Sequence, residues 1–239
     1  MSRGVIYIYW GNKLEAELQE SLKSVSKYGY DYRVFKLDES SHFGHKSTMY
    51  DLSPFDTTLF LDTDTILLDN IDFGFEMAEK HGIAMTIAPG CYARRFIPEL
   101  TDHIEYNTGA MFFSKNDVVK KVYNTWKSHS DEFPRSDQSS FTRAVYEHDF
   151  NVSVLPQNYN YRAGLNESQF FGPLKIWHSR LPLPINIHEW NARETLKFGY
   201  LHIGYRKGHT SIINSPNQPI MDFLVRFKQF LKSRANILK

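Results

Sequence analysis

Residues 57–70 read TTLFLDTDTILLDN and hold the pattern that decides the fold assignment. An apolar, strand-like run ends at Asp62, Asp64 follows two positions later, and a second apolar run comes next. In extended backbone, residues two positions apart point to the same side, so this spacing sets two carboxylates side by side. Adjacent anions repel unless a cation neutralises them, and Mg²⁺ or Mn²⁺ takes oxygen ligands of this kind. The stretch predicts a metal site at the carboxyl end of a buried strand, where ligands gather in open α/β sheets.

Two other interpretations of this acid pair were weighed. A solvated loop after a strand is disfavoured, because apolar runs on both sides frame the pair between two buried segments. The pair also matches part of the Asp-x-Asp-x-Thr motif of haloacid-dehalogenase-like, Mg²⁺-dependent phosphatases. That motif normally lies on the first strand, and Ile66 stands where its threonine belongs, with Thr65 one position earlier. The phosphatase is therefore the weaker alternative.

The segments around the acid pair predict an α/β fold. Residues 5–10 form a β-branched and aromatic run closed by Gly11, which is typical of a strand. Residues 13–28 carry apolar side chains at helical spacing, and residues 32–37 predict a second strand. A strand-helix-strand opening favours a central, mostly parallel sheet flanked by helices. We further expect strands at 82–88, 110–113 and 152–155, helices at 118–129 and 138–146, and a loop at 38–48.

Composition bounds the class of protein. The chain has 239 residues, which fits one domain over 1–239. Its 28 Lys and Arg against 27 Asp and Glu argue against a nucleic-acid binder, which usually has a basic excess. The single cysteine, Cys91, excludes an intramolecular disulfide framework and a cysteine-rich zinc site. No run has the length of a membrane-spanning helix and no signal peptide is recognisable, so we expect a cytoplasmic protein.

The order of motifs resembles a glycosyltransferase family of the Rossmann-like GT-A fold, that of glycogenin and bacterial lipopolysaccharide galactosyl- and glucosyltransferases. LFLDTDTILLDN is similar to the family's Asp-x-Asp stretch, and Lys46 resembles a basic residue that precedes it. YNTGAMFFSKND resembles the Asn-x-Gly strand, at Asn107 and Gly109. SDQSSF resembles the Asp-Gln motif, and LPQNYNYR the Leu-Pro-x-x-Tyr-Asn segment. The resemblance covers residues 5–178 and implies hexose transfer from a nucleotide-diphosphate sugar, preferably a UDP-sugar, with Mn²⁺ or Mg²⁺.

The resemblance also implies roles for particular residues. Asp62 and Asp64 would hold the metal, with Asp62 also near the donor's ribose. His178, in FFGPLKIWHSR, is the favoured third ligand; His202, in YLHIGYRKGH, is the alternate. The family's closing Pro-Trp is absent there. Candidate catalytic or sugar-binding residues are Asp137, Gln138 and Asn107. Candidate donor-binding residues are Tyr7, Tyr9, Gly11, Asn12, Lys46, Gly109, Arg180 and Lys207.

Several of these residues have a plain structural alternative. Tyr7 and Tyr9 share a face of the first strand and would serve core packing equally well. Asp137 is also a favoured residue for capping a helix. Arg180 and Lys207 suit diphosphate oxygens, but they are as readily explained as surface charge.

The end of the chain predicts two further features. Residues 158–219 are rich in aromatics, prolines and histidines, which indicates loops folded over a site. Residues 220–239 begin as a basic amphipathic helix, which either packs on the domain or contacts an anionic membrane near a lipid-linked acceptor. A non-catalytic nucleotide- or sugar-binding domain is the remaining alternative to the transferase and the phosphatase.

Overall fold

The fold is described from a computed structural model of the chain. It describes residues 1–12, 14–89, 103–132, 136–162, 173–184 and 187–188, and the backbone alone at 170–171, 200–201, 203–206 and 209–212. Cys91, His202, Lys207 and the predicted helix at 220–239 lie outside the described residues, and one domain over 1–239 stays a prediction. In the described part, no helix has the length and apolar character needed to cross a bilayer.

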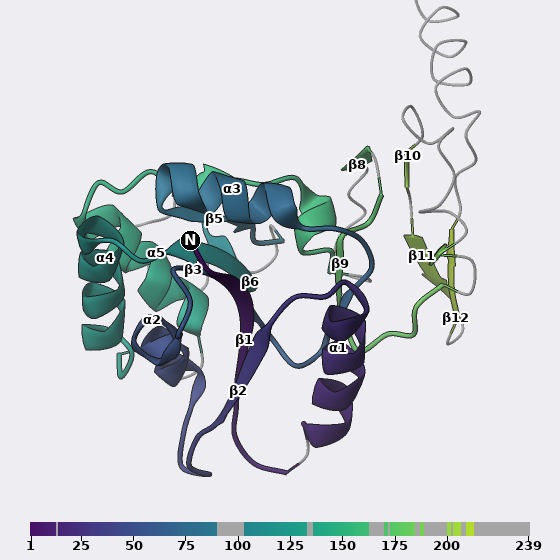
Figure 1. Cartoon of the computed structure of the whole chain (residues 1–239), viewed down its shortest axis with the longest axis horizontal. Coiled ribbons are helices and arrows are strands. Elements are labelled where there is room, and N and C mark those ends of the chain that lie inside the picture. Colours follow the sequence, from purple (N-terminus) through teal and green to yellow (C-terminus); the bar gives the residue numbers. More distant parts are fainter. Residues whose placement is uncertain are drawn as a thin grey trace, which may run out of the picture.

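A six-stranded sheet forms the centre of the fold, in the order β2-β1-β3-β6-β5-β7 (Figure 1). Only β6 runs against its neighbours, so the prediction of a mixed, mostly parallel sheet is confirmed. The strands are β1 (Arg3–Tyr9), β2 (Tyr32–Lys36), β3 (Thr57–Leu61), β5 (Ile83–Ile87), β6 (Tyr106–Ser114) and β7 (Ser153–Val154). Smaller two-stranded pairings join β4 (Thr65–Leu67) to β9 (Ile176–His178), β8 (Phe170–Phe171) to β10 (Tyr200–Leu201), and β11 (Ile203–Arg206) to β12 (His209–Ile212).

Helices cover both faces of the sheet. The helices are α1 (Glu15–Lys27), α2 (Met49–Leu52), α3 (Asp72–His81), α4 (Asp117–Ser128) and α5 (Asp137–Glu147), with 3₁₀ turns η1 (Phe43–Thr48) and η3 (Gln157–Tyr159). The core on one face joins side chains of α1 and α3 to the sheet, and the core on the other joins α2, α4 and α5 (Figure 1). The α1-facing core contains the odd positions of β1, and the α5-facing core contains Ile6 and Ile8. Each helix and strand that was predicted within the described residues is present, and β6 is longer than predicted.

Some elements, including η1 and α3, differ from the sequence expectation. The segment 38–48, expected to be a loop, contains η1, which begins after His42, whose ring accepts a hydrogen bond from the Gly44 amide. Helix α3 was not anticipated. Its Gly74 lies directly on the ring of Phe112, a close approach that only glycine allows.

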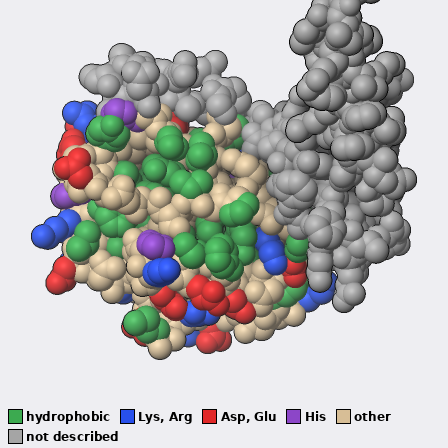
Figure 2. Space-filling model, turned by 90° about the horizontal axis from the view of Figure 1, so that it is seen from above, with side chains coloured by type: hydrophobic (Ala, Val, Ile, Leu, Met, Phe, Trp, Pro, Cys, Tyr) green, Lys and Arg blue, Asp and Glu red, His purple; other side chains and the backbone are tan. Residues whose placement is uncertain are grey.

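The face seen in Figure 2 carries charged side chains of both signs around its rim, with apolar and uncharged atoms between them. This distribution agrees with the near balance of charges in the sequence. No single-sign patch of the kind that binds a polyanion is visible in the described part of that face.

Gly74→Ala is expected to destabilise the protein by about 1–3 kcal/mol, the usual cost of overpacking a core. Alanine normally stabilises a helix over glycine by roughly 1 kcal/mol, but here its Cβ would lie 2.4 Å from Phe112 Cζ. Urea unfolding measures the difference, with Glu76→Ala on the exposed side of α3 as the control. A gain in stability for Gly74→Ala would contradict the packing described.

Candidate active site

The site lies at the carboxyl end of β3. The strand is buried on both sides and delivers Asp62 to the edge of the sheet, where the Asp62 amide donates to the Gly109 carbonyl at 2.9 Å. A turn over Asp62, Thr63 and Asp64 follows, and the Thr65 hydroxyl closes it by donating to the Asp62 carbonyl at 2.7 Å. The two carboxylates are thus held on a tight turn between two buried strands, as the spacing predicted.

Strand pairing brings His178 back to this turn. Strand β4 starts one residue after Asp64 and pairs antiparallel with β9, setting Thr65 opposite His178. His178 Nε2 lies 3.3 Å from Asp64 Oδ1 and 3.7 Å from Asp62 Oδ2. One ligand atom from each of the three residues lies within 4.8 Å of the others. Two carboxylates and an imidazole are a donor set that fits a divalent ion.

The orientation of the His178 ring is fixed by three neighbours. Its Cε1 lies against Gly109, where a Cβ would come within 2.0 Å of the ring, so only glycine leaves room for it. His178 Nδ1 is 2.7 Å from Asn160 Oδ1. The side-chain nitrogen of Asn160 donates to the Asn107 carbonyl, and this bond turns the side-chain oxygen of Asn160 toward the ring. Nδ1 must therefore carry the proton, and the lone pair of Nε2 faces the two carboxylates.

Lys46 forms the second part of the site. The residue is 5% exposed, and its ammonium lies 2.6 Å from Asp62 Oδ1 and 2.9 Å from Asp137 Oδ2. Burial alone would lower the pKa of Lys46, but the neighbouring carboxylates of Asp137 and Asp62 outweigh burial and raise it, so the lysine is charged. The Thr108 hydroxyl donates to the same Asp137 oxygen at 2.7 Å.

Asp64 also carries its charge in this environment. Burial opposes ionisation, but the neighbouring groups, Arg162 and Arg180 among them, hold the pKa of Asp64 below its usual value. Arg162 was not anticipated. Its Nη1 lies 3.9 Å from Asp64 Oδ2 and 2.5 Å from His178 Nε2.

The capping alternative for Asp137 is wrong. Ser136 is the residue that caps α5, through its side chain and the Ser139 amide, and Asp137 turns instead toward Lys46. Gln138 donates to Glu105 Oε1 at 2.9 Å. Burial raises the pKa of Glu105.

Two cavities meet at Lys46 and His178. One, of about 500 Å³, is lined on its outer part by Ile8, Trp10, Phe43 and Arg180. The other, of about 320 Å³, contains Asn107, Gly109, Asp137 and Gln138. Both are lined by Lys46, Asp62, Arg162 and His178. The structure therefore brings most of the predicted site residues together, although their roles stay predictions.

For Tyr7 and Tyr9 the structure supports the core-packing alternative and not the donor-binding one. Tyr7 and Tyr9 are both buried in the α1-facing core, and the Tyr7 hydroxyl bonds Ser21 Oγ at 2.8 Å. Because side chains alternate along a strand, Ile8 and Trp10 point to the cavity side instead. Gly11 has a φ of 71°, and Asn12 accepts from Lys36 at 3.0 Å; neither lines this cavity.

Arg180 lies at the rim of the site. It lines the larger cavity, but its Nε donates to Glu17 Oε1 at 2.8 Å and its side chain is 66% exposed. Arg180 is thus an ion-paired surface charge, as one sequence interpretation predicted. It also lies at the edge of a cavity, which leaves the other interpretation, contact with a diphosphate, open.

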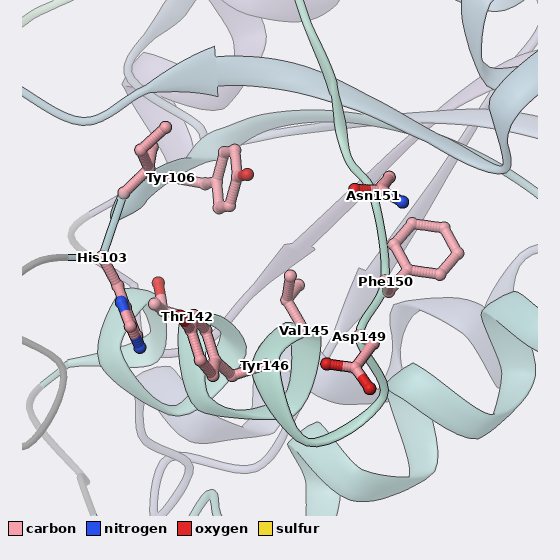
Figure 3. Close-up of a pocket in the computed structure, with 9 residues that line it drawn as sticks. His103, Tyr106, Thr142, Val145, Tyr146, Asp149, Phe150 and Asn151 are labelled. Atoms are coloured by element: carbon pink, nitrogen blue, oxygen red, sulfur yellow. The ribbon is translucent and has the colours of Figure 1, made fainter.

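A further cavity of about 560 Å³ lies between α5 and the segment before β6 (Figure 3). The rings of His103 and Tyr146 stack there with centroids 3.4 Å apart, beside Thr142 on α5 (Figure 3). Asp149 is the one carboxylate among its described lining residues. We place the chemistry at the acid pair despite the larger volume here, because the metal-ligand set and the buried lysine belong to the other two cavities.

Asn160→Ala is expected to weaken Mn²⁺ binding by about 10–100-fold, because His178 loses the partner that fixes its tautomer and orientation. Isothermal titration calorimetry of the purified protein measures the affinity. Asn158→Ala is the matched control, since this neighbouring buried asparagine donates to the Pro173 carbonyl. Equal Mn²⁺ affinity in both variants would contradict the role of Asn160.

Comparison with known proteins agrees with this architecture. The crystal structure of mouse xyloside xylosyltransferase 1 shares the fold, with a TM-score of 0.54 and 14% identity; the match covers 77% of this chain and 100% of that one. The crystal structure of galactosyltransferase LgtC with donor and acceptor sugar analogues also shares it, with a TM-score of 0.51 and 12% identity; this match covers 75% of this chain and 87% of that one. No curated protein matches the sequence. The nucleotide-diphospho-sugar transferase family model matches residues 57–178, just over half of the chain and the part that supplies the acid pair, Asp137 and His178. The chain therefore belongs to the nucleotide-diphospho-sugar transferase family and is a glycosyltransferase of the GT-A fold.

Proposed function

We propose that this glycosyltransferase moves a hexose from a UDP-sugar to a saccharide, lipid-linked or protein acceptor, with a divalent ion held by Asp62, Asp64 and His178. The observation that supports this proposal most strongly is that these three side chains converge where the two cavities meet. Family membership implies a nucleotide-sugar donor. The phosphatase and the non-catalytic binding domain are set aside, because neither agrees with that membership.

The donor set favours Mn²⁺ over Mg²⁺. Carboxylate oxygens suit both ions, but Mg²⁺ prefers ligands that are all oxygen. An imidazole with its Nε2 lone pair turned to the carboxylates suits a transition metal better. When bound, such an ion neutralises the charge that builds on the departing nucleoside diphosphate.

The larger cavity is the proposed donor site. Its volume lies in the range of small-ligand pockets. Trp10 and Phe43 pack edge to face at its outer end, with ring centroids 5.5 Å apart, and offer aromatic surface to a base. Arg162 and Arg180 supply cations toward a diphosphate between the base and the metal ligands.

The smaller cavity is the proposed site of the transferred sugar. Asn107, Asp137 and Gln138 line it and offer polar groups to hydroxyls. Lys46 bridges it to the donor side and holds the Asp137 carboxylate in place through a buried ion pair. Asp137 is the carboxylate that lines this cavity and not the larger one, and we assign it the catalytic role.

UDP is expected to raise the melting temperature only when Mn²⁺ is present, because the diphosphate needs the ion as its ligand. At 100 times the Kd, binding contributes about 2.7 kcal/mol, or roughly 5–10 °C for a chain of this size. Differential scanning fluorimetry with UDP, GDP and Mn²⁺ singly and combined measures this. Stabilisation by UDP alone, or no stabilisation in any combination, would refute the proposal.

Asp137→Ala is expected to lower the rate of UDP release from UDP-sugars by about 100-fold or more, the usual cost of removing one positioned polar group from a reacting centre. UDP-glucose, UDP-galactose and UDP-xylose serve as donors in a coupled UDP-release assay.

Asp117→Ala is the matched control for that experiment. Asp117 is the first residue of α4, as Asp137 is of α5, but it is exposed and far from the cavities. Normal turnover by Asp137→Ala would remove the catalytic assignment.

We further propose a cytoplasmic protein that reaches a lipid-linked acceptor through peripheral contact of residues 220–239 with an anionic membrane. The support is the basic amphipathic pattern of that segment. Co-sedimentation with anionic liposomes, comparing the full chain with one that ends before Ile220, tests it. Equal binding of the two would leave packing on the domain as the explanation of the pattern.

A further inference from the structure

Arg162 lies where the donor cavity and the sugar cavity meet, and it lines both. It directly follows Tyr161, whose backbone bonds both Ile176 and His178 of β9 and so anchors the base of the arginine. The side chain is 28% exposed, and its guanidinium reaches toward Asp64 and His178. Its base is thus fixed while its tip faces open cavity space.

The contact of Arg162 with His178 involves one particular nitrogen. Nη1 is 2.5 Å from Nε2, and the ring's other nitrogen is committed to Asn160. The guanidinium has donors and no acceptor, so Nε2 must accept with its lone pair. A metal–imidazole bond uses that same lone pair. Arg162 in this position and a metal ion on His178 therefore exclude one another.

We propose that Arg162 competes with the divalent ion for His178 and turns to the donor diphosphate when the ion binds. The inference rests on the proposed function, because it takes the ion and the diphosphate as ligands of this site. A guanidinium and a divalent ion repel at close range, whereas a diphosphate between them attracts both. The planar fork of arginine fits phosphate oxygens in a bidentate manner.

The surroundings of Arg162 favour such a turn. Asp64 lies at 3.9 Å, too far for a tight ion pair, so among the described residues the arginine gives up one close side-chain partner when it leaves His178. Arg180 differs, since its Nε is held at 2.8 Å by Glu17. Arg162, unlike Arg180, can therefore exchange its contact with the His178 lone pair for a contact with an anion at little energetic cost.

The proposal predicts that replacing Arg162 changes the affinities for Mn²⁺ and for UDP in opposite directions. Arg162→Ala is expected to bind Mn²⁺ about tenfold more tightly without nucleotide, because the competitor is gone. At saturating Mn²⁺ the same variant is expected to bind UDP about tenfold more weakly, because a phosphate ligand is gone; both are ordinary coupling magnitudes. Arg162→Lys should fall between, since it keeps the charge and loses the fork.

Mn²⁺ affinity is measured by electron paramagnetic resonance of free Mn²⁺ and by calorimetry, and UDP affinity by calorimetry at saturating Mn²⁺. Arg143→Ala is the control, a part-exposed arginine paired with Glu132 and Glu147 and lining none of the cavities described. Circular dichroism and thermal unfolding verify that each variant is folded. A merely structural role would weaken both affinities together, so the opposite signs are diagnostic.

The failures of the two proposals are distinguishable. If the wild type binds UDP with Mn²⁺ and Arg162→Ala leaves the Mn²⁺ affinity unchanged or lower, the competition is refuted and the proposed function stands. If neither protein binds Mn²⁺ without nucleotide, the competition is likewise refuted. If the wild type binds UDP without metal and Arg162→Ala abolishes that binding, the arginine serves permanently in place of the ion, which overturns both proposals.

Discussion

The buried ammonium of Lys46 is the interaction on which the rest of the site depends. It joins η1, the end of β3 and the start of α5 by contacting Asp62 and Asp137 at 2.6 and 2.9 Å. Burying charges is costly unless each is paired, and breaking a buried pair costs about 3–5 kcal/mol because a charge is left uncompensated. The two carboxylates can therefore approach one another only through Lys46. That constraint also places the two cavities next to each other, because Lys46 and Asp62 line both of them.

A second constraint governs the metal ligands. The acid pair is local in sequence, but His178 arrives from more than a hundred residues away through the pairing of β4 with β9. Strand pairing fixes only the backbone of His178. The orientation of its ring depends on the space left by Gly109, which has no side chain, and on the hydrogen bond to the side chain of Asn160. The Asn-x-Gly segment and the Tyr-Asn segment, which resemble family motifs, thus act on the same imidazole. Their shared contact explains in physical terms why both occur in one chain.

The sequence predicts the features that depend on local pattern and leaves open those that depend on distant contacts. Periodicity identified the sheet strands, and the Asp-x-Asp spacing identified the ligand pair. Alternation indicated that Tyr7 and Tyr9 share a side of β1 but not which side meets the cavity. Core packing and donor binding therefore stayed equally open until the structure placed Ile8 and Trp10 at the cavity. Arg162 follows a segment without periodicity, and its role became visible only when β9 placed His178 beside it.

The charges at the junction explain how one ion converts an acid-rich pocket into a site for an anion. Three carboxylates, Asp62, Asp64 and Asp137, face two cations, Lys46 and Arg162. The cluster alone is net negative and repels a diphosphate. A divalent ion reverses the sign, and it also releases Arg162 to face the incoming phosphates. Binding of the ion and binding of the donor are then coupled by charge, so neither ligand is held well without the other.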